Sequence, residues 1–129
     1  MAERLLAGKR LEWSRTFTEG EVRHFAELSG DKGTHHMEPD AKGRLMAHGL
    51  LTATLPTKLG GDLNFIAGTM DFEFLRPVYA GEALACVGIV DSVVPEPRRN
   101  RVKFSFTVTN PKGKLVLRGS SSGVIYPGT

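Results

Sequence analysis

The chain has one cysteine among its 129 residues. It therefore forms no disulfide within itself and offers no cluster of cysteine ligands to a metal. Because Cys86 lies in the apolar run 83–87, we expect a buried structural thiol. Long apolar runs are also missing, since none approaches the roughly 20 residues that a membrane helix needs. Residues 1–10 contain no signal-peptide core, so we expect a cytoplasmic protein that does not enter a membrane.

A strong charge of one sign is absent as well. The 17 basic and 14 acidic residues give a net charge of +3. The one local basic cluster is too small for the broad footprint typical of nucleic-acid binding, so no nucleic-acid partner is expected. A solvated hairpin is the simplest interpretation, and a landing site for a phosphorylated ligand or an acidic carrier protein is the functional alternative. The cluster consists of Arg98, Arg99, Arg101 and Lys103.

Several cofactor motifs are missing. No glycine-rich phosphate-binding motif follows a predicted strand, and no nucleophile-elbow sequence is present. The four histidines lack a recognised ligand spacing, so we expect no metal and no cofactor. Nicotinamide-dependent and nucleotide-hydrolysing enzymes are therefore disfavoured.

The composition is that of an ordinary globular protein. Hydrophobic residues make up 40% of the chain and charged residues 24%, with 15 glycines and 7 prolines. These values exclude a disordered or collagen-like chain. The length suits one compact domain and is too short for two stable ones. We therefore predict a single domain over residues 1–129, without repeats or linkers.

The first third of the chain alternates between a strand, a helix and a loop. Apolar residues at every second position predict a half-buried strand over 11–17. Thr18 and Glu21 have the spacing of a capping box, with Phe17 and Val22 at the positions of a hydrophobic staple, so a helix begins here. Gly30 is a natural end for it. Residues 31–44 show no periodicity and predict a loop of functional length.

The rest of the chain predicts a buried helix followed by strands. Residues 45–59 are apolar nearly all round, which indicates a buried helix. Pro56 should kink or end it, and the pair Gly60–Gly61 should close it. Period-two segments then predict strands over 70–74, 82–94, 101–109 and 115–126. Successive strands favour an antiparallel sheet. We predict an α+β fold in which a curved antiparallel sheet wraps around one central helix.

Candidate chemical groups gather in two segments. Asp31 and His36 share one short loop, where a carboxylate and an imidazole can hold a water and move protons at neutral pH. A helix cap and a surface histidine are the plain alternative. His48 and Gly49 open the buried helix, where a free backbone N–H could stabilise a developing oxyanion. Close packing of the helix on the sheet is the alternative there. Thr57 offers a hydroxyl further along the same helix.

Three segments in order resemble one known family. They are Asp31-x4-His36, then Met46-Ala-His-Gly-Leu-Leu51, then Phe72-Glu-Phe-Leu-Arg-Pro-Val-Tyr-Ala-Gly-Glu82. Together they are similar to the MaoC-like dehydratases, which include the (R)-specific enoyl-CoA hydratases. The resemblance covers roughly residues 10 to 126. It implies the hot-dog fold and a homodimer or a dimer of dimers.

The resemblance also implies a reaction and its residues. The reaction is the reversible hydration of a trans-2-enoyl thioester of coenzyme A or acyl carrier protein to the (R)-3-hydroxyacyl thioester. Asp31 and His36 match the pair that activates water, and Gly49 matches the residue whose N–H holds the thioester oxygen. Thr57 matches a position where the family often has a serine, and His48 is a further candidate for substrate binding.

The chain departs from the family pattern inside the catalytic loop. Gly33 and Thr34 replace the usual Asn and Pro, and a glycine there gives the backbone more freedom. Two other functions therefore stay open. An acyl-CoA thioesterase should carry a carboxylate on the central helix, and residues 48–59 contain no Asp or Glu. A non-catalytic module that binds acyl thioesters would need no turnover.

Overall fold

The computed structural model describes residues 4–128. The predicted domain 1–129 therefore extends beyond the described residues at both ends, and the prediction of one domain remains open. In chain order the elements are β1 (Arg10–Thr16), α1 (Glu19–Ser29), α2 (Thr34–Met37), α3 (Gly49–Thr52), α4 (Thr54–Asp62), β2 (Ile66–Phe74), β3 (Ala83–Pro95), β4 (Asn100–Thr109) and β5 (Leu115–Ile125).

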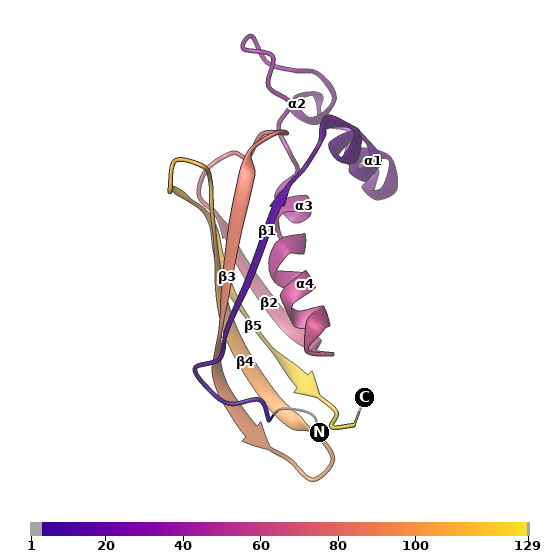
Figure 1. Cartoon of the computed structure of the whole chain (residues 1–129). Helices are drawn as coiled ribbons and strands as arrows, with labels where there is room; N and C mark the ends of the chain where they lie inside the picture. The colour runs from indigo at the N-terminus through magenta and orange to yellow at the C-terminus, as the bar shows by residue number, and fades with distance from the viewer. Residues whose placement is uncertain (1–3, 129) are drawn as a thin grey trace.

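The five strands form one sheet in the order β1-β3-β4-β5-β2. Every neighbouring pair is antiparallel. Helices α3 and α4 lie along one face of this long sheet, while α1 and α2 sit together at one end of it (Figure 1). The prediction of an α+β hot-dog fold, with a curved antiparallel sheet around a central helix, is confirmed.

Burial of apolar side chains between the central helix and the sheet holds the fold together. Leu55 and Leu59 of α4 are fully or almost fully buried, as are Leu84 of β3 and Phe104 of β4. Each such side chain stabilises the fold by about 1.5–3 kcal/mol relative to exposure. Cys86 is buried in the same core, as predicted, and its burial raises the pKa of the thiol to about 12.

Helix α1 begins and ends where the sequence predicts. The Thr18 hydroxyl accepts a bond from the Glu21 N–H at 3.1 Å, and the Glu21 carboxylate accepts one from the Thr18 N–H at 3.0 Å. This backbone bond and Arg15 together lower the pKa of Glu21. Phe17 and Val22 are both buried. Gly30 ends the helix with a φ of +79°, a conformation that glycine adopts without strain.

The central helix differs from its prediction at both ends. It begins at Gly49 rather than residue 45, because residues 45–47 are extended and Met46 forms an isolated bridge with Tyr79. It is interrupted at Ala53, three residues before Pro56, as expected since proline crowds the carbonyl one turn earlier. Gly60 and Gly61 do not close it, because α4 continues to Asp62.

Two further predicted boundaries are wrong. Residues 34–37, expected within a loop, form the short helix α2. Strand β2 begins at Ile66 rather than at residue 70. Both differences lie in segments whose apolar pattern is weak, so tertiary contacts decide their conformation.

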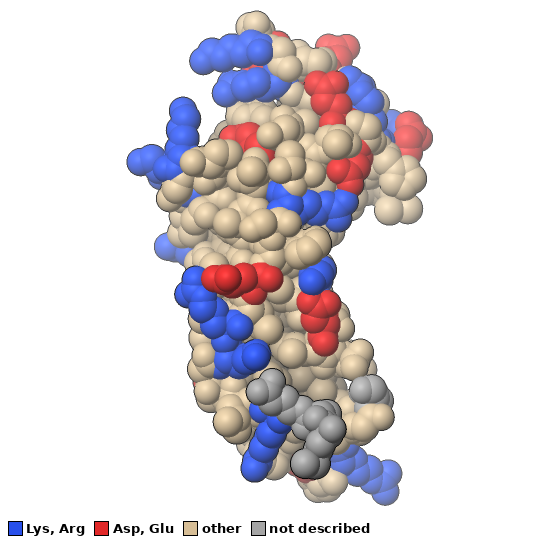
Figure 2. All heavy atoms as spheres, in the orientation of Figure 1, with Lys and Arg blue, Asp and Glu red and all other residues tan. Residues whose placement is uncertain are grey.

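Charges of both signs are mixed on the face of the molecule drawn in Figure 2. Figure 2 shows Lys and Arg side chains interspersed with Asp and Glu over the face in view, rather than gathered into one field. Within residues 4–128, none of the helices combines the length and the apolar character that a membrane crossing requires.

The close approach of β2 to β5 generates a first prediction. A Cβ on Gly119 would lie 1.9 Å from the Asp71 carbonyl oxygen and 2.9 Å from the Phe106 ring. We expect Gly119→Ala to lower the free energy of unfolding by about 1–3 kcal/mol, because the strands must move apart. Urea unfolding measures this change. The control is Gly61→Ala, where a Cβ meets nothing within 4 Å and helix propensity improves. An unchanged midpoint for Gly119→Ala would contradict the close approach.

Candidate active site

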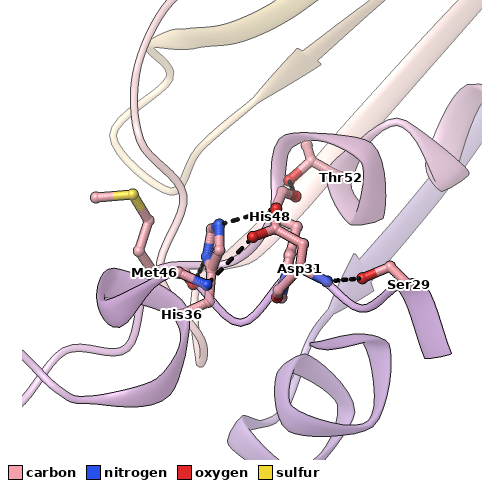
Figure 3. Close-up of polar contacts among 7 residues, drawn as sticks. Ser29, Asp31, His36, Met46, His48 and Thr52 are labelled. Atoms are coloured by element: carbon pink, nitrogen blue, oxygen red, sulfur yellow. Dashed lines mark hydrogen bonds and ion pairs between the residues drawn. The ribbon is translucent and has the colours of Figure 1, made fainter. Parts of the chain in front are cut away.

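The loop between α1 and α2 brings Asp31 and His36 face to face. The His36 Nε2 atom lies 3.8 Å from the Asp31 Oδ2 atom, and Figure 3 shows the two side chains pointing toward one another. His36 is 5% exposed, whereas the Asp31 side chain is 58% exposed. A gap of 3.8 Å is longer than a hydrogen bond. It leaves room for one water oxygen at about 2.8 Å from each atom.

Hydrogen bonding fixes which nitrogen of His36 carries the proton. The His36 Nδ1 atom lies 2.8 Å from the Met46 carbonyl oxygen. Because a carbonyl only accepts, Nδ1 must donate, and the neutral ring then has a free lone pair on Nε2. That lone pair faces the Asp31 carboxylate. His36 Nε2 is therefore placed to accept a proton from a water held between the two side chains.

A second buried histidine lies directly against His36. His48 is 2% exposed, and its ring stacks on the His36 ring with centroids 3.7 Å apart. The His48 Nε2 atom lies 2.8 Å from the Asp31 carbonyl oxygen, so Nε2 carries the proton. Its Nδ1 atom is buried and has no hydrogen-bond partner within residues 4–128. In their neutral forms the two rings are therefore opposite tautomers, with the proton on Nδ1 in His36 and on Nε2 in His48.

These groups border a pocket with a volume of about 560 Å³. This size is in the range of small-molecule sites, which span roughly 300–1,000 Å³. Its polar lining includes Asp31, His36 and the hydroxyl-bearing Thr52. The apolar lining consists of Phe25, Phe74, Leu75, Val78 and Val116, among others. Such a pocket suits a ligand with an apolar chain and one polar, reactive group.

Gly49 opens helix α3 at the same pocket. Its N–H makes no backbone hydrogen bond within residues 4–128. A Cβ at this position would lie 2.8 Å from the Phe74 ring, so the missing side chain leaves just enough room for that ring. A ligand atom can approach the Gly49 amide at the open end of the helix.

An ion pair outside the pocket supports the segment that carries Met46. Asp40 accepts bonds from the Arg44 N–H at 2.9 Å and from the Arg44 side chain at 2.9 Å, and these bonds lower the pKa of Asp40. The Arg44 guanidinium in turn lies 4.1 Å from the centre of the Tyr79 ring. Tyr79 pairs with Met46, so these contacts connect the ion pair to the residue whose carbonyl faces His36.

The same histidines make a weak metal site. Asp31, His36 and His48 each offer one ligand atom within 4.8 Å of the others. However, His36 Nδ1 and His48 Nε2 donate to carbonyl groups, and the remaining His48 nitrogen is buried. The donor set therefore fits a metal poorly, and the absence of a metal remains a prediction.

Comparison with known proteins finds relatives over almost the whole chain. No family model matches the chain. It is 27% identical over 134 residues to an (R)-specific enoyl-CoA hydratase of Rhodospirillum rubrum, with 95% of this chain and 90% of the relative covered. It is 24% identical to a mitochondrial 3-hydroxyacyl-[acyl-carrier-protein] dehydratase of Arabidopsis thaliana, with 95% and 78% covered.

Solved structures extend the comparison. An (R)-hydratase from A. caviae, involved in PHA biosynthesis, superimposes with a TM-score of 0.84 and 27% identity, covering 98% of this chain and 100% of that one. These similarities support the MaoC-like hot-dog family for this chain. The curated relatives are hydro-lyases, and this MaoC-like protein is an enzyme of that class. A MaoC-like dehydratase from Rhodospirillum rubrum shares the fold at a TM-score of 0.77 and 21% identity, covering 95% of this chain and 93% of that one.

Four of the five predicted site residues of this MaoC-like protein meet at one pocket. Asp31, His36, His48 and Gly49 all line it. The fifth, Thr57, lies on the exposed flank of α4 and donates to the Thr54 carbonyl at 2.8 Å. It is not among the lining residues that the structure describes, and its role as a substrate contact remains untested.

Some pocket residues were not predicted from the sequence. Thr52, and not Thr57, lines the pocket, and it is buried. The sequence alone does not distinguish Thr52 from Thr54 and Thr57, which follow within five residues. Phe25 and Phe74 also line it, although each appears in the sequence as an ordinary core residue of a helix or strand. Their roles depend on side-chain directions that periodicity alone does not define.

The ring tautomers of this MaoC-like protein can be tested without substrate. We expect ¹⁵N spectra of the imidazoles in their neutral forms to show Nδ1–H for His36 and Nε2–H for His48. The cause is the carbonyl acceptor that faces each of these nitrogens. The exposed His24 serves as the reference, and His36→Ala assigns the signals. The opposite tautomer at either buried ring would contradict the described hydrogen bonds.

Proposed function

We propose that this protein interconverts trans-2-enoyl and (R)-3-hydroxyacyl thioesters by adding or removing water. The observation that carries the proposal is the 3.8 Å gap between His36 Nε2 and the Asp31 carboxylate at the mouth of an apolar pocket. Relatives named as an (R)-specific enoyl-CoA hydratase and a 3-hydroxyacyl-[acyl-carrier-protein] dehydratase support it. The choice between coenzyme A and acyl carrier protein stays open.

The water is held by two acceptors. The Asp31 carboxylate and the His36 Nε2 lone pair each accept a hydrogen bond from the water, so an oxygen lone pair of the water turns toward the substrate. The acyl chain lies against the apolar wall formed by Phe25, Val78 and Val116. Burial of His36 reduces competition from bulk solvent, while the exposed Asp31 carboxylate keeps a path for water exchange.

The hydration step then balances as follows. The water oxygen forms a bond to C3 of the enoyl group while His36 Nε2 takes one water proton. The electrons of the double bond move toward the thioester carbonyl and form an enolate. The proton on His36 Nε2 is delivered to C2 on the same face, which restores the neutral imidazole. Dehydration is the reverse sequence, with His36 first removing the C2 proton.

The Gly49 N–H is the proposed donor to the thioester oxygen. As the negative charge of the enolate develops on that oxygen, a hydrogen bond from a fixed amide becomes stronger. The donor at the start of α3 makes no backbone hydrogen bond and borders the pocket. Loss of one such donor typically lowers the rate by about 10²–10³-fold.

The basic residues at 98–103 have no part in this proposal. Arg99 and Arg101 both pair with Glu96 and lower its pKa. They lie in the β3–β4 hairpin, at the end of the sheet opposite α2 and α3 (Figure 1). Within one chain this cluster is therefore a solvated hairpin away from the pocket. A cytoplasmic location likewise remains a prediction from the sequence.

We also propose that the protein is a homodimer joined along β2. This strand stands at the edge of the sheet, and its outer edge leaves backbone groups free to pair with a second copy. Met70 and Phe74, which lie on one face of this strand, are 38% and 52% exposed and give the edge apolar surface for a second copy.

Loss of either water-binding group tests the proposed reaction. We expect Asp31→Asn and His36→Ala to lower the hydration rate of enoyl-CoA by about 10²–10⁴-fold, because each removes an acid–base group. Loss of the enoyl absorbance and release of free thiol are followed in parallel over several chain lengths. Glu38→Gln and His24→Ala are the matched controls, since both residues are exposed and lie outside the pocket lining.

Each other result of this assay contradicts the proposal. Thiol release that outpaces enoyl loss would assign a thioesterase. Binding without turnover on CoA and carrier-protein substrates alike would assign a binding module. Full activity in Asp31→Asn would remove the carboxylate from the mechanism.

The edge strand gives a prediction of its own. We expect the wild-type chain of 14.1 kDa to sediment at twice that mass, and Met70→Lys to shift it toward the monomer by placing a charge in the apolar interface. The control is Val94→Lys, since Val94 is 54% exposed on β3, away from the edge strand. A wild-type monomer, or a Met70→Lys variant that still dimerises fully, would disprove pairing along β2.

A further inference from the structure

We propose that His48 is a positioning residue, which holds Asp31 and His36 at a fixed distance from the Gly49 amide and does not touch the substrate. This inference rests on the proposed function. It arises from a buried imidazole that the reaction does not use, although it contacts both members of the water-binding pair (Figure 3).

The hydrogen bond from His48 is the long-range anchor of Asp31. The Asp31 N–H donates to Ser29 at 3.1 Å, and its carboxylate accepts from Gly33 at 3.2 Å. Both partners are two residues away and move with the same loop. The bond from His48 Nε2 to the Asp31 carbonyl at 2.8 Å spans 17 residues. It ties this loop to the start of α3.

Ring contacts extend the same support to His36. The His48 ring lies under His36 with an interplanar angle of 16° and a centroid distance of 3.7 Å. The Phe25 and His48 rings meet edge to face with centroids 4.9 Å apart, and the exposed His35 ring lies tilted against His36 with centroids 3.9 Å apart. With Nδ1 donating to the Met46 carbonyl, His36 is held by one hydrogen bond and by contacts with two other rings.

Neither nitrogen of His48 is available for chemistry. Nε2 needs its proton for the Asp31 carbonyl, and Nδ1 is buried without a partner in the described part of the chain. A buried polar atom without a partner lowers the stability of the fold. If His48 only filled space in the core, an apolar side chain of the same size would therefore be more stable. The bond from Nε2 explains why an imidazole stands here.

The place of His48 in the sequence completes the argument. It immediately precedes Gly49, so the residue that anchors the water-binding loop is joined by one peptide bond to the proposed oxyanion donor. Attack on C3 and charge on the thioester oxygen require these two groups at a set separation, and a displacement near 1 Å typically lowers a rate by about 10²-fold.

Two amide variants separate this role from simple packing. The side-chain nitrogen of His48→Gln lies as many bonds from Cα as Nε2 and can reach the Asp31 carbonyl, whereas that of His48→Asn is one bond short. Both remove the ring. We expect His48→Asn to lower kcat by about 10–100-fold with KM changed by less than about 3-fold, and His48→Gln to recover a large part of kcat.

Different results would overturn the inference. Equal losses of kcat in both variants would reduce His48 to a packing residue, as would wild-type kcat in both. A raised KM at unchanged kcat would make His48 a substrate contact. Unfolding curves identify a variant that fails to fold, and the recovery in His48→Gln is then compared at matched folded fractions.

A second measurement needs no substrate. Hydrogen–deuterium exchange over residues 30–37 is expected to be faster in His48→Asn than in His48→Gln or the wild type, because the loop loses its anchor. Equal exchange in all three would overturn the positioning role. If the wild type turns over no enoyl thioester, the proposed function fails, and the exchange rates alone then decide the role of His48.

Discussion

The constraint on which the rest of the structure depends is the fit of one helix into one curved sheet. Leu59 of α4 comes so close to β3 that a Cβ on Gly88 would lie 3.1 Å from its methyl group. Because Leu55 and Leu59 are both buried, helix α4 packs against the sheet in one position. That position fixes where α3 begins, and the pocket forms there, beside the loop that follows α1.

Local signals in the sequence predicted the elements whose causes are local. The capping box at Thr18 and Glu21 determines the start of α1 through two hydrogen bonds between near neighbours. The strict alternation over 101–109 predicted β4, since one face of that strand is buried. Segment 45–47 was assigned to the helix wrongly, because a buried extended segment and a buried helix are equally apolar. The Ala47 N–H, which donates to the Val78 carbonyl at 2.8 Å, decides between them.

The candidate site was predictable in its parts rather than in its arrangement. The spacing of Asp31 and His36 and the pair His48–Gly49 were visible in the sequence, and the structure brings them together at one pocket. The stacking of the His48 ring on the His36 ring was not predicted, since it depends on the directions of side chains from separate segments. Gly33 also takes on a different meaning. A Cβ there would lie 2.9 Å from the His35 ring, so glycine makes room for a ring that packs on His36.

The reactivity of Cys86 can report local opening of the sheet. The only thiol of the chain is 1% exposed and stands opposite Trp13 on β1 and Val108 on β4. With a pKa near 12, it is almost entirely uncharged at neutral pH, and only the thiolate reacts with thiol reagents. A reagent therefore labels a molecule chiefly when the sheet has parted at this place. The labelling rate follows the opening rate where labelling outpaces reclosing, and the population of the open state where it does not.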